Sequence, residues 1–461
     1  MPEQKNLFAD FSKTVLKDWE EKISKDLKGK PLESLQSLSS DGITIKPVYN
    51  HENTSISDQP FKSNTKWDTV QELFVDDPSK GNKEALDHLN RGATSLLFYL
   101  YGDCDLEALL KDIQIEFIRI NFVVEGSALG LAQNFLTIIE KRGLNPNEIA
   151  GSINIDCLES LARTGSWLSS EDDDFDRVAA LYEVLPENLK GLCINTNLFA
   201  NAGATLAQQL GISLSMMYEY IHRLQLGHTS GFWINFAIGS DYFGEIAKLR
   251  AFRRLHSTLE QELGLLETEI HIYAETALRN KTMADRYNNM IRSTSEAMAA
   301  VIGGANEVSV KGFNHTYKEP DSFGERIAKN QLSMLEHESH FNAVNDLSKG
   351  SYFIENLTEE LAQKGWEFFK DLEAQGGFVE AMKSGWLQEQ VQASAEAEQT
   401  AFDTQTKTLI GANKFAQKDE SLADFVEYGM FSSPDAEGEV VRKIVPKRLS
   451  EELELDLINN G

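Results

Sequence analysis

The chain has 461 residues, of which 41% are hydrophobic and 9% aromatic, and a formal net charge of −28. This length predicts one large α/β domain with extensions, or two to three smaller domains. The negative charge disfavours nucleic acid as a partner, because phosphates favour lysine and arginine on the protein. It also disfavours anionic ligands unless basic groups cluster locally. No apolar run approaches the roughly 18 to 20 residues that span a bilayer, so no membrane partner is expected.

The first residues and the cysteines predict a cytoplasmic location. The chain does not start with a basic segment followed by an apolar one, so a signal peptide is not expected. Cys104, Cys157 and Cys193 are far apart and form no CxxC pair. They are therefore expected as small core residues, with no metal ion bound, in a reducing compartment.

Residues 1–45 predict an N-terminal helical arm. Apolar side chains recur there at helical spacing and form one apolar face: Phe8, Phe11, Val15, Leu16 and Trp19. A monomer can fold this face onto itself, or the arm can dock on a partner subunit. Both interpretations remain open from the sequence.

Residues 46–400 alternate between strand and helix signals. Strands are expected at 95–101, 117–124, 152–158, 192–199, 232–238, 269–274, 307–311 and near 351–354, and helices include 128–142, 205–224 and 242–263. This alternation predicts a parallel sheet with right-handed crossovers, and the number of repeats favours a closed (β/α)8 TIM barrel. A doubly wound open sheet is the alternative, but residues 102–105 are not its glycine-rich phosphate turn. Residues 401–461 predict a linker-like, C-terminal helical extension with a loop at 432–438.

Polar side chains follow several of the expected strands, where a barrel carries its active site. They are Glu125, Asp156, Asn195, Asn197, Asp241 and Glu275. Such groups bind Mg²⁺ or act as acid and base, but no ligand spacing singles them out, so helix capping or solvent exposure is favoured. His337 and His340 are interpreted as a solvated helix end. Gly303 and Gly304 lack the lysine and hydroxyl residue that complete a phosphate loop.

Several stretches of the chain resemble the methylmalonyl-CoA mutase family. They lie at 19–49, 239–251, 285–300, 323–330, 346–358 and 410–415, in the family's order, and the run EIAKLRA at 245–251 is similar almost letter for letter. The resemblance implies a (β/α)8 barrel and a dimer, either of two catalytic chains or of a catalytic large subunit with a homologous small one. The family's reaction interconverts methylmalonyl-CoA and succinyl-CoA through radicals supplied by adenosylcobalamin.

This sequence departs from the family's pattern where the chemistry takes place. Glu72 replaces the catalytic tyrosine, and Val70 replaces an arginine just before it. Asn197 and Leu198 stand at a Tyr-His pair, and leucine has neither a donor nor a titrating proton. His271 replaces the arginine that opens a CoA-gripping run, and a neutral imidazole does not replace a guanidinium.

The departures imply a catalytically degenerate small subunit. The Asp-x-His-x-x-Gly motif of the cobalamin domain does not occur in the sequence. We therefore expect no cofactor in this chain, adenosylcobalamin in a large partner subunit, and a homodimer as a possible isolated form. An active acyl-CoA mutase barrel with its cobalamin domain on a separate chain is the alternative, and an unrelated activity of the same barrel is a third. The bulky side chains of Leu198, Phe199 and Phe236 predict a closed or narrowed channel along the barrel axis.

Overall fold

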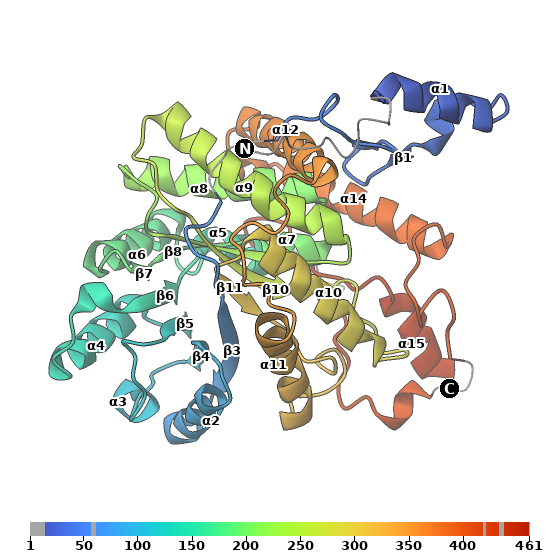
Figure 1. The fold of residues 1–461 in the computed structure, drawn as a ribbon. Helices are drawn as coiled ribbons and strands as arrows, with labels where there is room; N and C mark the ends of the chain where they lie inside the picture. Colours follow the sequence, from blue (N-terminus) through green and yellow to red (C-terminus); the bar gives the residue numbers. More distant parts are fainter. Residues whose placement is uncertain (1–13, 57–60, 418–420, 433–437, 461) are drawn as a thin grey trace, which may run out of the picture.

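A computed structural model describes residues 14–56, 61–417, 421–432 and 438–460. Its centre is a closed parallel barrel (Figure 1). The strands are β3 (Asp68–Val75), β4 (Ser95–Tyr101), β5 (Arg119–Glu125), β6 (Ala150–Asn154), β7 (Leu189–Lys190), β8 (Leu192–Asn195), β9 (Phe232–Ile238), β10 (His271–Thr276) and β11 (Glu307–Ser309). Their order is β7-β6-β5-β4-β3-β11-β10-β9-β8. Only Gly191 separates β7, which pairs with β6, from β8, which pairs with β9, so together they act as one strand that closes the sheet.

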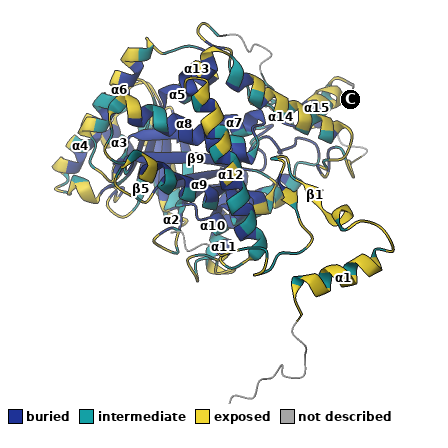
Figure 2. Cartoon of the chain, turned by 90° about the horizontal axis from the view of Figure 1, so that it is seen from above, coloured by how far each residue is buried: buried dark blue, intermediate teal, exposed yellow. Residues whose placement is uncertain are grey.

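Helices surround the barrel and cover its outer face (Figures 1 and 2). They are α2 (Pro78–Asn90), α3 (Leu106–Leu109), α4 (Ala128–Lys141), α5 (Cys157–Thr164), α6 (Glu171–Val184), α7 (Asn197–Ala202), α8 (Leu206–Leu224), α9 (Tyr242–Leu263), α10 (Asn288–Gly303) and α11 (Ser322–His337). Four more form the C-terminal part: α12 (Tyr352–Ala374), α13 (Phe378–Lys383), α14 (Trp386–Asp403) and α15 (Glu451–Asn460). The expected TIM-type barrel is confirmed.

The strands are buried on both faces, as a parallel sheet inside a helical ring requires. In β9 every residue is buried. Phe232 and Phe236 point outward into the helical layer, where Phe236 packs on Phe252 of α9 with ring centroids 5.0 Å apart. Trp233 alternates to the inner face.

The middle of the barrel is filled with side chains. Val70, Leu97, Cys193, Trp233 and Tyr273 form one buried cluster contributed by five strands. The rings of Trp233 and Tyr273 are stacked, with centroids 4.7 Å apart and planes at 28°. This layer takes the place of an open channel along the axis.

The prediction of which residues close the channel was wrong. Leu198, Phe199 and Phe236 belong to the outer core between the sheet and the helices. Phe199 packs there on Phe378 of α13, with ring centroids 6.0 Å apart. An apolar run does not reveal which of its residues face inward until the register of the strand is known.

Several element boundaries differ from expectation. The strand expected near 351–354 is instead the start of α12, because a short apolar run has the same composition in a buried strand and a buried helix. Strand β3 was not expected. The strands expected at 152–158 and 192–199 end at Asn154 and Asn195, where α5 and α7 follow after one or two residues. Gly304, with φ of 90°, ends α10 in the left-handed conformation that glycine favours.

An extended C-terminal segment runs across the loops that follow the strands. The backbone N–H of Ile444 donates to Ala162 O (2.7 Å) and that of Leu449 donates to Arg279 O (2.9 Å). Glu454 of α15 is buried and accepts hydrogen bonds from Met283 N and the Arg448 guanidinium. Most of the loop expected at 432–438 lies outside the described residues.

The N-terminal helix α1 (Leu16–Asp26) stands away from the barrel (Figure 2). It contains no buried residue. Phe8 and Phe11 of the expected apolar face lie outside the described residues. No helix in the described part of the chain combines the length and apolar character needed to cross a membrane.

Candidate functional site at the mouth of the barrel

Glu72 is the centre of a polar cluster at the C-terminal mouth of the barrel. It points inward from β3 and accepts hydrogen bonds from Tyr273 Oη (3.0 Å) and Ser309 Oγ (2.7 Å). Lys311, in the loop after β11, places Nζ 2.8 and 2.7 Å from its two carboxylate oxygens. The same Nζ lies 3.2 Å from Glu275 Oε2 at the end of β10. Strands on both sides of the mouth are thus joined through side chains.

Three of the residues singled out in the sequence meet in this cluster. Glu72 and Glu275 share Lys311, and Asn197 Nδ2 donates to Glu275 Oε1 (2.8 Å). Lys311 and Ser309 were missed by sequence reasoning. Their only signal was their place at the end of an expected strand, where side chains face the mouth of a barrel.

The charged groups of the cluster stabilise one another. Burial raises the pKa of Glu72, but Lys311 and the hydroxyl of Ser309 outweigh it and hold this pKa below its usual value. Burial lowers the pKa of Lys311, but Glu275 and Glu72 hold it well above its ordinary value. Both groups therefore stay ionised at neutral pH, and neither is poised to transfer a proton.

A second polar layer lies near the N-terminal end of the barrel. Glu307 of β11 is fully buried and accepts from Ser95 Oγ (2.6 Å), Asn121 Nδ2 (2.8 Å) and Trp233 Nε1 (3.2 Å). His271 Nε2 lies 2.7 Å from Glu307 Oε2, the oxygen that also accepts from Trp233. Burial and the nearby positive charge of Arg119 lower the pKa of His271 to about 4.

Val70 and His271 therefore lie inside the barrel but below the mouth. Val70 belongs to the filled middle layer, and His271 is bound to Glu307 beneath it. Leu198, on α7, is buried in the outer core and does not line the mouth. These three positions aligned with the family's substrate site thus lie in three separate environments: the middle layer, the layer around Glu307 and the outer core.

The remaining candidates act as caps or stand in solvent. Asp156 caps α5, accepts from Tyr220 Oη (2.9 Å) and has its pKa raised to about 6 by burial. Asp241 caps α9 by accepting from Gly244 N (3.1 Å). Asn195 exchanges side-chain hydrogen bonds with Asn154, and Glu125 is exposed. Helix capping and solvent exposure, the favoured interpretations, are confirmed for the three acids.

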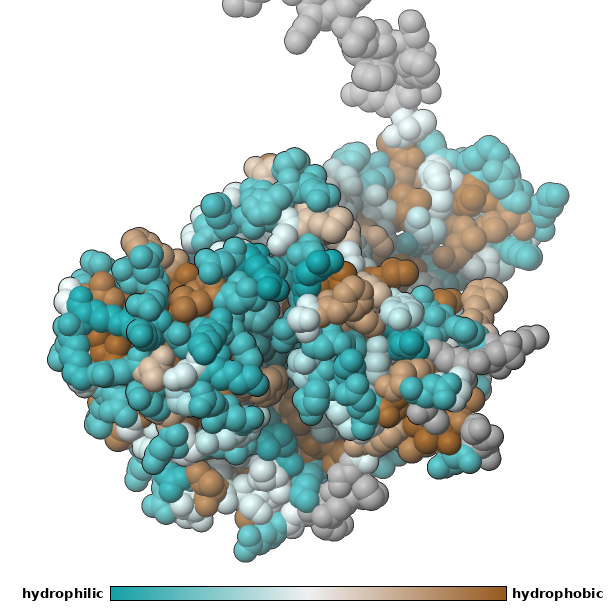
Figure 3. Space-filling view, turned by 90° about the horizontal axis from the view of Figure 1, so that it is seen from below, coloured by the Kyte–Doolittle hydropathy of each residue, from teal (hydrophilic) through white to brown (hydrophobic). Residues whose placement is uncertain are grey.

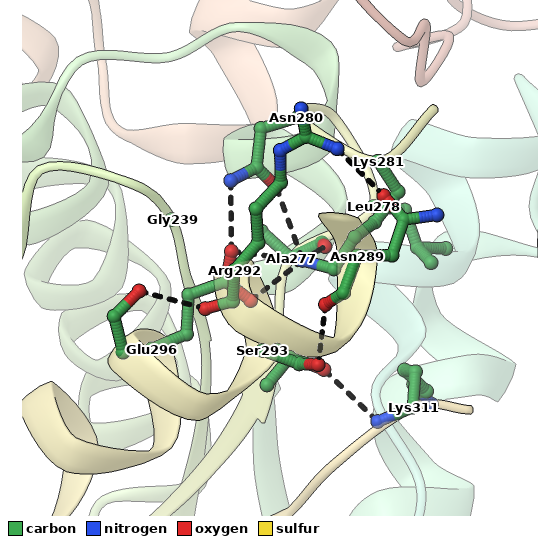
Figure 4. Close-up of polar contacts among 12 residues, drawn as sticks. Gly239, Ala277, Leu278, Asn280, Lys281, Asn289, Arg292, Ser293, Glu296 and Lys311 are labelled. Carbon is green, nitrogen blue, oxygen red and sulfur yellow. Dashed lines mark hydrogen bonds and ion pairs between the residues drawn. The ribbon is translucent and has the colours of Figure 1, made fainter. Parts of the chain in front are cut away.

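Next to the cluster, a buried network fixes the loop that follows β10 (Figure 4). Lys281 Nζ lies 2.6 Å from Glu296 Oε2 of α10 and donates to Ala277 O (2.8 Å). Asn280 Nδ2 donates to Glu296 Oε1 (2.7 Å). Arg292 Nη1 donates to Asn289 Oδ1 (2.9 Å). All these groups have partners within the chain, so the loop is held rigidly beside the mouth.

The cluster does not have the composition of a metal site. Within the described ranges, no three His, Cys, Asp or Glu side chains gather closely enough to hold a metal ion. At the mouth, both carboxylates are bound to Lys311, so an internal ammonium stands where a metal ion would be needed. His337 is 73% exposed at the end of α11, as a solvated helix end should be.

Comparisons with known proteins agree with this architecture. Residues 103–457 match the family model described as methylmalonyl-CoA mutase. The chain is 34% identical to a methylmalonyl-CoA mutase small subunit of Porphyromonas gingivalis, over 92% of this chain and 73% of the relative. It is 30% identical to a small subunit of the same name in Streptomyces virginiae, over 89% and 72%.

A third relative carries a different name. The 2-hydroxyisobutanoyl-CoA mutase large subunit of Aquincola tertiaricarbonis is 27% identical over 73% of this chain and 62% of the relative. The substrate and the subunit named thus differ among the relatives. The match to the family model, however, covers most of the barrel. The chain therefore belongs to the methylmalonyl-CoA mutase family.

Proposed function

We propose that this chain is the small, non-catalytic subunit of a heterodimeric methylmalonyl-CoA mutase and stabilises a cobalamin-binding large subunit. The observation that carries the proposal is the closed polar cluster in which Lys311 is bound between Glu72 and Glu275. The side chains of Glu72, Glu275 and Lys311 are thus already bound to one another within the chain. The two relatives named as small subunits support the same assignment.

Neither of the two positions that match the family's Tyr-His pair is placed to polarise a thioester. Asn197 donates its amide to Glu275, and Leu198 is turned into the outer core. An acyl chain entering along the axis would also have to displace the stacked rings of Trp233 and Tyr273. We therefore assign adenosylcobalamin and turnover to the large subunit, and no cofactor to this chain. The expected location is the cytoplasm.

The N-terminal arm offers a surface for that partner. Leu16, Trp19 and Ile23 lie on one face of α1 and are only half-buried, and Leu38 nearby is 72% exposed. In the space-filling view, hydrophobic side chains gather on this projecting part of the molecule (Figure 3). An apolar face that the described residues cover only partly favours docking on the large subunit. In the isolated chain the same face can pair two copies.

Reconstitution tests the catalytic assignment. This chain, the large subunit and their mixture are each assayed with adenosylcobalamin and methylmalonyl-CoA. We expect no turnover by this chain alone, and a mixture that is more active or more stable than the large subunit alone. Turnover by this chain with only a separate cobalamin-domain protein would overturn the proposal. It would favour the alternative, in which this barrel is itself an active acyl-CoA mutase. The Aquincola relative is named for an activity of that kind.

A pair of matched variants tests the arm. Leu38→Ser removes an exposed apolar side chain from the arm, and Leu266→Ser removes one of similar exposure (70%) from the barrel. We expect Leu38→Ser, but not Leu266→Ser, to weaken the complex in sedimentation velocity. Equal effects of the two variants would exclude the arm as the docking surface.

A further inference from the structure

The barrel has one seam where backbone pairing stops early. Strand β3 extends from Asp68 to Val75, but it pairs with β11 only at Asp68 and Thr69. On its other side β3 pairs with β4 at six positions, and β4 pairs with β5 at seven. Above Thr69 the edges of β3 and β11 are therefore not joined by a ladder.

Side chains replace the missing ladder at this seam. Ser309, at the end of β11, and Lys311, just beyond it, both bind the Glu72 carboxylate of β3. Tyr273 of β10 reaches the same carboxylate from inside the barrel. Three donors from one side of the seam thus converge on a single acceptor on the other side. The Glu72 and Lys311 side chains are 10% and 12% exposed, so water competes weakly for these bonds.

The helical layer leaves this seam partly uncovered. A cleft of about 490 Å³ lies between α2 and α11, and Glu72, Ser309 and Lys311 form part of its lining. Across it, His88 Nε2 of α2 lies 3.7 Å from Glu325 Oε2 of α11. The pairing of β6 with β7 is also short, but there Asn154 and Asn195 exchange hydrogen bonds directly above it. Below Thr69, the ladder and the Glu307 layer join β11 to β3, β4 and β5, whereas above it the side-chain bonds across the seam converge on the Glu72 carboxylate.

We propose that Glu72 is a latch: through Lys311, Ser309 and Tyr273 it keeps the barrel closed at the seam between β3 and β11, and releasing it lets the barrel open sideways there. The latch occupies the mouth with the chain's own charges, so the closed form needs no ligand. This property belongs to the isolated chain and does not depend on which subunit performs catalysis.

The three cysteines provide the test. Cys193 is fully buried in the middle layer of the barrel interior, whereas Cys157 is buried in the outer core, and Cys104 is partly exposed. Lateral opening exposes Cys193 before Cys157, but global unfolding exposes both together. The full chain is treated with methyl methanethiosulfonate in native buffer, and labelling of each cysteine is followed by mass spectrometry.

Lys311→Met removes the ammonium from the latch and keeps the shape of the side chain. We expect Cys193 to be labelled at least about tenfold faster than in the wild type, because a buried ion pair that loses one partner is strongly weakened, with Cys157 unchanged. Glu125→Gln, at the same mouth but outside the cluster, should label like the wild type. Parallel acceleration at Cys193 and Cys157 would overturn the proposal, as would no acceleration at Cys193.

Milder variants keep the test decisive if Lys311→Met does not fold. Ser309→Ala and Tyr273→Phe each remove one hydrogen bond to Glu72, and both should accelerate Cys193 labelling by a smaller factor. Hydrogen exchange locates the opening: faster exchange should appear in peptides from β3 and β11 and not in those from β4 and β5. Faster exchange confined to β6 and β8 would place the opening at the wrong seam and refute the latch. Failure of the reconstitution experiment leaves all these outcomes unaffected.

Discussion

Replacing Trp233 with alanine tests whether the barrel interior is packed. The side chain is fully buried, stacks on Tyr273 and donates to Glu307 (3.2 Å). Truncating a buried tryptophan costs about 3–5 kcal/mol, and the lost stacking adds about 0.5–1.5 kcal/mol. The loss at Glu307 is small because Ser95, Asn121 and His271 still contact it. We therefore expect Trp233→Ala to lower the free energy of unfolding by about 3.5–6.5 kcal/mol.

Urea unfolding followed by circular dichroism measures this difference. Trp233→Phe is the matched control, since it keeps an aromatic ring and loses the hydrogen bond and part of the buried volume, so it should cost less than Trp233→Ala. The midpoint should move while the slope with denaturant stays constant. A loss below about 1 kcal/mol for Trp233→Ala would mean that the interior is loosely packed, contrary to the filled middle layer. It would also remove one reason for assigning catalysis to the other subunit.

Three further predictions concern buried side chains. Because the pKa of His271 falls to about 4 from its ordinary 6.5, the unfolded chain binds a proton that the folded chain does not. The contribution of neutral His271 to the free energy of unfolding is complete above pH 6.5 and is lost as the pH falls toward 4. The loss amounts to about 2 kcal/mol between pH 7 and 5. His271→Asn should therefore make the urea midpoint depend less on pH between about pH 7 and 5. An unchanged pH dependence would contradict the lowered pKa of His271. Lys281→Met should cost about 3–5 kcal/mol by leaving Glu296 buried without its cation, and adding Glu296→Leu should restore much of it in thermal unfolding. Leu198→His should gain no mutase activity and lose about 1–3 kcal/mol, because the imidazole enters an apolar core; turnover by this variant alone would show that Leu198 faces the site.

The barrel was largely predictable because its signal is repetitive. Alternating apolar runs and amphipathic helices located seven of the strands to within a few residues, including the fully buried β9. Strand β3 was missed because its sequence, DTVQELFV, mixes charged and apolar residues. Its inner face carries Glu72, which is bound by Tyr273 of β10 and Ser309 of β11, and local periodicity contains no information about such partners.

The site was only partly predictable for the same reason. Glu72, Asn197 and Glu275 could be named from resemblance or from strand ends, but the contact of Glu72 and Glu275 with Lys311 could not. That contact joins positions 239 residues apart in the case of Glu72. Conversely, Leu198 is adjacent to Asn197 in sequence yet points into a different environment, because the two positions lie on different sides of α7.

The layer around Glu307 constrains the order in which the barrel folds during synthesis. Its acceptor comes from the last strand of the barrel, whereas its donors Ser95 and Asn121 precede it by 212 and 186 residues. A ribosome needs on the order of ten seconds or more to make the intervening residues. During that time the donors of β4 and β5 must remain hydrated or find temporary partners, and the loop that closes last is long. The interior is therefore completed in one late step, and an interruption before Glu307 leaves an open sheet with unpaired edges, the form most exposed to aggregation.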